Sequence, residues 1–261
     1  YRDYTPEYSA GNPTWYLARS LAEGYAYQGE HSSYRNNESR GGKTTNLRVS
    51  SFVNFLQNHD QVGNRAFGER IAALTSKQAL KAAICLLLLA PEIPLLFMGE
   101  EWGSRTNFLF FSNLSSELSE SIREGRRREF SRFPEFVDPA NREKIPDPTI
   151  ESTFNASVLD WNKQDAEILD FYRQMLKTRK EQIIPLIPLI EHSKSTFEVI
   201  DEGCFKVKWF AINGKTLELT ANLSSKEVLL DVDVNKDIIA KYTEREEQGK
   251  LTAWSVFWHL K

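Results

Sequence analysis

Residues 51–61 (SFVNFLQNHDQ) and residues 94–103 (PLLFMGEEWG) decide the fold of this chain. In each stretch a short apolar run predicts a strand: a short buried strand over 51–57 in the first, and a second short apolar strand over 95–98. A cluster of polar and acidic side chains directly follows each run. The two stretches therefore have the same pattern: a strand followed directly by side chains that can form hydrogen bonds.

Residues 76–90, between the two strands, are apolar nearly all round, which predicts a buried helix that Pro91 ends. The order is strand, helix, strand, and the strands of such a unit run parallel with the helix packed on their sheet. Both polar clusters then lie at the carboxyl ends of parallel strands. In an α/β barrel that end carries the active site, whereas the other end serves stability.

Helical spacing of apolar residues predicts further helices over 14–28, with Pro13 in the first turn and Gly29 at the end, and over 166–180. Residues 30–50 are polar and rich in Gly, Asn and Ser, which predicts a long surface loop, either a substrate-facing lid or a plain connector. One face of another helix is marked by Leu114, Leu118, Ile122, Phe130 and Phe133.

After about residue 192 the apolar pattern changes from helical to alternating, which predicts a small antiparallel β domain. Asn213-Gly214 predicts a type I′ hairpin turn within it. The domain boundary is expected near His192, with residues 1–191 before it and 192–261 after it. The expected strands are 196–200, 204–212, 215–223, 228–234 and 253–260.

The composition excludes several classes of protein. The 261 residues carry 33 Lys and Arg against 36 Asp and Glu, and a net charge of -3 disfavours a dedicated nucleic-acid binder. The longest apolar run, 82–90, is too short to span a membrane. Cys85 and Cys204 make no disulfide framework. Without a Gly-rich phosphate loop, HExxH, CxxC or GxSxG motif, no metal and no cofactor is expected.

Four side chains at the end of the first strand, Asn58, His59, Asp60 and Gln61, suit a sugar, whose hydroxyls need many directional partners. Two other interpretations remain open: Asp60 as the N-cap of the next helix, and His59 as a half-buried structural histidine. Arg65 in the following loop is a weaker candidate, because an ordinary salt-bridged loop accounts for it.

At the end of the second strand, Glu100 and Glu101 beside Trp102 also fit a glycan site. Carboxylates stabilise a cationic transition state, and an aromatic face stacks on a pyranose ring. The alternative is that the two glutamates are solvated loop charges. The run 126–128 (RRR) is flanked by glutamates, which indicates a solvated helix face rather than a phosphate site.

Four stretches together carry a resemblance to a known family: 52–70 (FVNFLQNHDQVGNRAFGER), 94–103, 123–130 (REGRRREF) and 145–161 (IPDPTIESTFNASVLDW). They closely resemble the maltooligosyltrehalose trehalohydrolases, a family of the α-amylase clan. The NHD tripeptide alone occurs across the clan, whereas its continuation and the other stretches are specific to this branch. The resemblance runs along the whole chain.

The resemblance implies a (β/α)8 TIM barrel, of which 51–57 is strand seven and 95–98 strand eight, followed by a small antiparallel β-sandwich. It implies retaining hydrolysis of the α-1,4 bond next to the terminal trehalose of a maltooligosyltrehalose, by a cytoplasmic enzyme that needs no cofactor. In this reading Asp60 stabilises the transition state and His59 binds the same sugar. The remaining substrate-binding candidates are Asn58, Gln61, Arg65, Glu100, Glu101 and Trp102.

Two of the three catalytic carboxylates of the family precede strand seven. No G-x-R-x-D pattern precedes 51–57 here, so the nucleophile and the general acid/base are not expected in this chain. We therefore expect the C-terminal portion of an enzyme, inactive alone, whose partner is the N-terminal barrel portion. The loop 111–114 (FSNL) departs from the expected Phe-Thr-Asp-His, which puts substrate contacts there in doubt.

Two alternatives remain open at this stage. The chain could be a non-catalytic carbohydrate- or partner-binding fragment, or part of a clan enzyme with branching or debranching activity. A coding sequence upstream of Tyr1 that contains a G-x-R-x-D strand end would favour the enzyme over the binding fragment. Release of trehalose rather than glucose or maltose would favour trehalohydrolase over branching or debranching activity.

Overall fold

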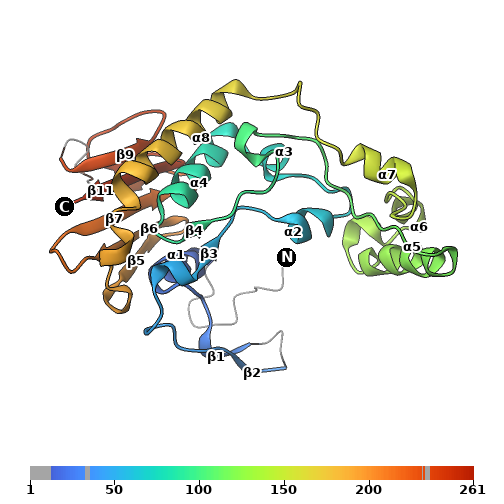
Figure 1. Cartoon of the computed structure of the whole chain (residues 1–261), viewed down its shortest axis with the longest axis horizontal. Helices are drawn as coiled ribbons and strands as arrows, with labels where there is room; N and C mark the ends of the chain where they lie inside the picture. Colours follow the sequence, from blue (N-terminus) through green and yellow to red (C-terminus); the bar gives the residue numbers. More distant parts are fainter. Residues whose placement is uncertain (1–12, 33–35, 231, 233–235) are drawn as a thin grey trace. The chain divides into compact units, whose positions relative to one another are not determined.

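The computed structural model describes residues 13–32, 36–230, 232 and 236–261. These residues form two compact units (Figure 1). The first unit contains the described residues up to Asn54, together with Lys77–Leu95 and Phe171–Lys261. The second unit contains Phe55–Ser76 and Leu96–Asp170. No helix among the described residues is long and apolar enough to cross a membrane.

A five-stranded antiparallel sheet dominates the first unit, in the order β5-β6-β7-β11-β9. The prediction of an antiparallel C-terminal β region is thereby confirmed. Two short strands, β8 and β10, pair separately, and the predicted strand 228–234 is reduced to Val228–Leu229, with 231 and 233–235 outside the described residues. The strands are β5 Thr196–Asp201, β6 Cys204–Phe210, β7 Thr216–Asn222, β8 Val228–Leu229, β9 Ile238–Tyr242, β10 Lys250–Leu251 and β11 Ser255–Leu260.

Helices cover one face of this sheet. Helix α1 (Pro13–Glu23) lies against β5 and β6, and α4 (Lys77–Leu89) lies against β9 and β11 (Figure 1). Between them Trp209 and Trp258 stack with ring centroids 5.6 Å apart, both fully buried. The Trp209 indole N–H donates to the Leu21 carbonyl at 3.2 Å, which satisfies its buried donor.

The other face is covered by the β8–β10 pair, which closes a small core of Cys204, Val228, Leu251 and Phe257. Among the described residues, the second layer of the expected β-sandwich consists of two short strands, and helices supply the layer on the opposite side. Strand β7 is buried along nearly its whole length, as a strand covered on both faces must be.

The turn between β6 and β7 differs from its prediction. A type I′ turn needs positive φ at both central residues, yet of Asn213 and Gly214 only Gly214 has one, at 83°. The Gly214 N–H donates to the Ala211 carbonyl at 3.0 Å, and the Ala211 N–H donates to the Lys215 carbonyl at 2.9 Å. This pattern is that of a type I turn followed by a left-handed glycine.

The predicted strand-helix-strand unit is confirmed: β3 (Val53–Asn54) and β4 (Ile93–Pro94) are parallel and α4 lies between them in sequence. Both strands are shorter than predicted, and β4 precedes 95–98. Alternate residues donate the backbone hydrogen bonds between the two strands. The Ile93 N–H donates to the Phe52 carbonyl, and the Leu95 N–H donates to the Asn54 carbonyl. Pro94, which has no N–H, fits the position between them.

The burial predicted for the first of these strands is wrong, because Val53 is 50% exposed; Ile93 in β4 is 47% exposed as well. Helix α4, by contrast, is buried on most sides as predicted. The described residues contain this one parallel pair of strands, with no neighbour on either side of it. Its apolar side chains therefore lack the cover that a complete barrel would provide.

A buried arginine closes the turn between α4 and β4. Helix α8 (Ala166–Thr178) continues into a π-helical turn, η5 (Arg179–Ile183), and the Arg179 guanidinium donates to the carbonyls of Leu88, Ala90 and Glu92. Burial lowers the pKa of Arg179 and raises that of the fully buried Glu92 to about 8. Both Glu92 carboxyl oxygens lack a hydrogen-bond partner.

Replacing Glu92 by Gln is expected to stabilise the protein at alkaline pH. The folded-state pKa of about 8 lies above the ordinary 4.5, so folding favours the protonated carboxyl. The stability that the protonated Glu92 carboxyl contributes is complete below pH 4.5. It declines as the pH rises and is lost above about pH 8. Urea unfolding at pH 9 should show a gain of up to about 5 kcal/mol, with almost none at pH 4. An equal gain at both pH values would contradict the assignment.

The region 24–50 also differs from its prediction. Helix α1 ends at Glu23 rather than at Gly29, since Gly24 has φ 81° and a Cβ there would lie 2.3 Å from the Phe52 ring. Strands β1 (Gln28–Ser32) and β2 (Glu38–Gly41) then form an antiparallel hairpin where a loop was expected.

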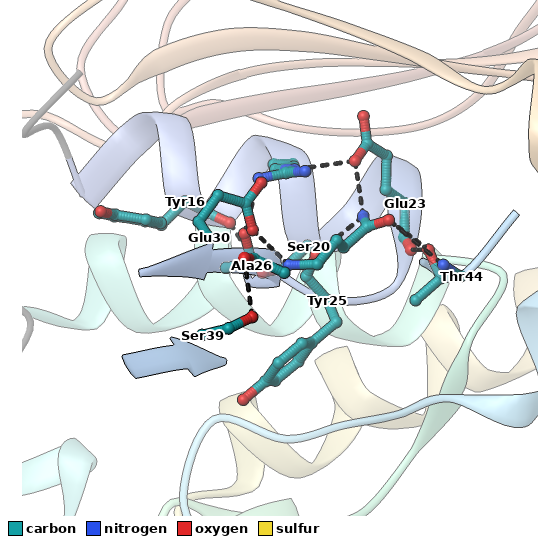
Figure 2. Close-up of polar contacts among 11 residues, drawn as sticks. Tyr16, Ser20, Glu23, Tyr25, Ala26, Glu30, Ser39 and Thr44 are labelled. Atoms are coloured by element: carbon teal, nitrogen blue, oxygen red, sulfur yellow. Dashed lines mark hydrogen bonds and ion pairs between the residues drawn. The ribbon is translucent and has the colours of Figure 1, made fainter. Parts of the chain in front are cut away.

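Side-chain hydrogen bonds hold this hairpin to α1. The Arg19 side chain donates to Glu23 at 2.8 Å, to Glu30 at 2.5 Å and to the Ala26 carbonyl at 2.9 Å (Figure 2). Burial raises the pKa of Glu30, but hydrogen bonds from the Gln28 N–H and Arg19 outweigh it, so the pKa lies below its ordinary value. A polar hairpin of this kind leaves no alternating apolar pattern in the sequence.

The second unit is built from short helices and irregular segments. In the predicted helix α5, Phe130 is buried, but Leu114 and Leu118 are 51% and 52% exposed, so they do not form the expected apolar face. The helices are α2 His59–Gly63, α3 Ile71–Leu74, η3 Glu100–Trp102, α5 Ser116–Phe130, η4 Pro134–Phe136, α6 Pro139–Arg142 and α7 Glu151–Ala156.

Candidate functional site

The short helix α2 positions the first group of candidate residues. Asn58 has extended backbone angles, and its side-chain oxygen accepts the Gln61 N–H at 2.8 Å, so Asn58 is the N-cap and Asp60 is not. His59 and Asp60 follow in the first turn, with side chains 71% and 73% exposed. The His59 Nε2 atom lies 3.3 Å from the Asp60 Oδ1 atom. An imidazole and a carboxylate thus stand together on an open surface.

Beyond α2 the chain forms the ordinary salt-bridged loop that the sequence favoured as the interpretation of Arg65. Arg65 Nε lies 3.1 Å from the Glu69 carboxylate, with side chains 43% and 31% exposed. Exposed pairs of this kind contribute little to stability. Gln61 is exposed, and its backbone N–H serves the Asn58 cap.

Arg126 fixes the far end of α2, and the predicted solvated helix face is wrong for this residue. Its guanidinium donates to the carbonyls of Gly63 at 2.7 Å and Arg65 at 2.9 Å. It also lies 4.8 Å from the Phe110 ring and 4.9 Å from the Phe130 ring. A cation that binds the last carbonyls stabilises a helix end. The Arg126–Phe130 spacing of four, on one helix face, is the signal that could have revealed it.

A second buried arginine, Arg70, supports the segment that carries Glu100 and Glu101. It is fully buried, donates to the carbonyls of Met98 at 2.7 Å and Thr106 at 2.6 Å, and lies 4.6 Å from the Phe97 ring. Burial lowers the pKa of Arg70, against the opposing charges of Glu100 and Glu101. Glu100 is itself 3% exposed, so it is neither a solvated loop charge nor open to a ligand.

Trp102 is also buried, at 4% exposure, so its ring offers no open face to a sugar. It packs instead under Trp161, with ring centroids 4.6 Å apart and planes at 44°. Trp161 is 64% exposed. The exposed aromatic surface therefore belongs to Trp161, which lies in the stretch 145–161 and has no role predicted from sequence.

The candidates thus separate into two sets. His59, Asp60, Gln61 and Arg65 are exposed and available to a ligand, with Glu101 partly exposed. Asn58, Glu100 and Trp102 support the site from within. The described residues contain no group of three or more His, Cys, Asp or Glu side chains that could hold a metal ion. The open carboxylate and imidazole of Asp60 and His59 suit hydrogen bonds with sugar hydroxyls, and the exposed Trp161 ring suits stacking on a sugar face.

Comparison with known proteins confirms the resemblance described above. Residues 192–258 match a family described as a domain of unknown function, DUF3459. The malto-oligosyltrehalose trehalohydrolase of Saccharolobus solfataricus is 40% identical over 166 residues, 63% of this chain and 27% of that protein. The enzyme of the same name from Brevibacterium helvolum is 34% identical over 221 residues, 82% of this chain and 36% of that protein.

A solved structure agrees with this comparison. The crystal structure of a candidate α-amylase from Salmonella typhimurium superposes with a TM-score of 0.84 at 38% identity and covers 95% of this chain. This chain in turn covers 41% of that protein. The chain therefore spans about a quarter to two fifths of the length of the relatives it matches.

Proposed function

We propose that this chain, which resembles the malto-oligosyltrehalose trehalohydrolases over as much as 83% of its length, forms the C-terminal part of a glycoside hydrolase. The enzyme would cleave the α-1,4-glucosidic bond next to the terminal trehalose of a maltooligosyltrehalose and release trehalose with retention. One observation carries the proposal: the open His59–Asp60 pair on α2, just after the parallel strand β3 in the sequence.

In this proposal Asp60 acts through its negative charge. The transition state of glycoside hydrolysis resembles an oxocarbenium ion, so an open carboxylate beside the ring stabilises it and accepts hydrogen bonds from the sugar hydroxyls. His59, in contact with Asp60, donates to the same ring. Cleavage with retention needs two further carboxyl groups about 5 Å apart, which we assign to a preceding barrel portion. The chain alone is therefore expected to be inactive.

The test is an assay of the chain extended by its upstream coding sequence. Incubation with maltotriosyltrehalose should release trehalose together with maltotriose as its α anomer, and the chain alone should release neither. Release of glucose or maltose, or transfer that creates α-1,6 branches, would assign another activity of the α-amylase clan and overturn the trehalohydrolase proposal.

A partner-binding role for the chain as it stands is supported by the exposed apolar side chains of the parallel pair. Val53, Ile93 and Leu95 are 50%, 47% and 43% exposed. Sheet faces with this much apolar surface favour association. A barrel portion expressed as a separate chain should co-elute with this one in size-exclusion chromatography. Separate elution together with glucan binding by the chain alone would favour a non-catalytic binding module.

Trp161 provides a test of the substrate surface. Replacing it by Ala removes a ring that is 64% exposed, so the fold should be retained. We expect KM for maltotriosyltrehalose to rise about tenfold in the extended enzyme, with kcat changed much less, because ring stacking contributes to binding. The matched variant Trp161→Phe keeps an aromatic face and should retain most of the affinity. An unchanged KM in Trp161→Ala would exclude the ring from the substrate surface.

A further inference from the structure

A second concave site lies in the first unit, near the start of α1. Its volume is about 520 Å³, within the range of small-molecule pockets. Helix α1 meets three further segments there: the β5–β6 turn, the loop after β7, and the residue that precedes β11. The lining residues used below are Leu17, Glu202, Gly203, Ser224, Lys226 and Trp254.

Trp254 lines this pocket in a conformation that bulky residues rarely adopt. Its φ is 52°, in the left-handed region, and its N–H donates to the Ser224 carbonyl at 3.1 Å. A left-handed tryptophan costs conformational energy, and costs of this kind concentrate at functional sites. The β5–β6 turn on the other side of the pocket requires glycine at position 203. Gly203 has φ 77°, and a Cβ there would lie 2.9 Å from the Ser224 Cβ.

A buried asparagine holds the rim of the pocket in place. Asn222 is fully buried, and its side-chain amide donates to the carbonyls of Lys226 at 2.7 Å, Leu251 at 3.2 Å and Thr252 at 3.0 Å. Its side-chain oxygen accepts the Ser224 N–H at 3.1 Å and the Ser224 hydroxyl at 2.7 Å. With its hydrogen bonds made, Asn222 preorganises the loop that carries the pocket wall.

We infer that this pocket binds a glucosyl unit of an α-1,4-glucan, with the Trp254 ring stacked on the sugar. A pyranose has an apolar face and a polar edge, and the pocket offers an aromatic ring, the apolar Leu17 and the Ser224 hydroxyl oxygen, which can accept from a sugar hydroxyl while its proton is donated to Asn222. The exposed Lys226 and Glu202 carry opposite charges, which favours a neutral ligand over a phosphate. The choice of an α-glucan among neutral sugars rests on the proposed function.

The test observes Trp254 directly. The full chain is labelled with 5-fluorotryptophan and titrated with maltoheptaose, and the ¹⁹F resonance missing from Trp254→Asn identifies Trp254. Asn tolerates left-handed φ, so this variant retains the backbone while removing the ring. The Trp254 resonance is expected to shift with saturation, and a resonance that stays unchanged at every maltoheptaose concentration overturns the inference.

Two further variants make the result specific. Leu17, 36% exposed on α1, is replaced by Arg to fill the pocket, which should weaken the saturation constant about tenfold or more. Leu229, 81% exposed outside the pocket, is replaced by Asn as the matched control and should leave the constant unchanged. Equal constants in Leu17→Arg and the wild type overturn the inference.

The outcome is separable from that of the proposed function. A Trp254 shift with maltoheptaose in a protein that releases no trehalose retains the pocket and removes the proposed activity. A Trp254 shift with cellohexaose but none with maltoheptaose overturns the assignment to an α-glucan.

Discussion

Asp60→Asn is expected to lower kcat for maltotriosyltrehalose about a thousandfold in the enzyme extended by its upstream segment. The substitution removes the negative charge and retains the shape of the side chain, so the transition state loses its electrostatic stabilisation. The Asp60 side chain is 73% exposed, and its Oδ1 atom lies 3.3 Å from the His59 Nε2 atom. Its loss should therefore leave the midpoint of thermal unfolding unchanged.

The matched control for this substitution is Glu117→Gln, which neutralises an exposed carboxylate in the first turn of another helix, α5. It should retain wild-type kcat. Steady-state kinetics with trehalose quantified as product, together with thermal unfolding of both variants, would separate catalysis from folding. Near-normal turnover in a folded Asp60→Asn enzyme would remove Asp60 from the mechanism.

Arg179→Met should produce the largest loss of stability, about 3 kcal/mol or more in the free energy of unfolding. Methionine retains much of the apolar stem, but the carbonyls of Leu88, Ala90 and Glu92 lose their buried donor. Unpaired carbonyls in the interior cost desolvation energy that the unfolded chain does not pay.

Urea denaturation monitored by circular dichroism measures this loss, and Arg128→Met, at an exposed position on α5, is its control. The control should change the free energy of unfolding by no more than about 0.5 kcal/mol. A loss below about 1 kcal/mol in Arg179→Met would mean that water replaces the guanidinium donors.

The parts of the fold that the sequence predicted are those with local patterns. The apolar run of 76–90 predicted α4 to within one residue at each end, and the alternation after residue 192 predicted β5, β6, β7 and β11. The parallel pairing of β3 and β4 followed from their order along the chain. Each of these predictions depended on residues close together in sequence.

The parts that the sequence did not predict depend on distant partners. The β1–β2 hairpin is held by side-chain hydrogen bonds to α1 and carries no apolar alternation. Arg126 had the composition of a solvated face, yet it binds carbonyls 61 and 63 positions away. A charge run looks the same in sequence whether its residues meet water or buried carbonyls.

For the candidate site, the sequence by itself determined which chemistry-bearing groups follow the parallel strands, because strand order and polarity are local properties. Only the tertiary structure decided which of them are open: His59 and Asp60 are exposed, whereas Glu100 and Trp102 are buried beside Arg70 and under Trp161. The physical reason is that exposure depends on what packs against a residue from elsewhere in the chain, and no local pattern encodes those neighbours.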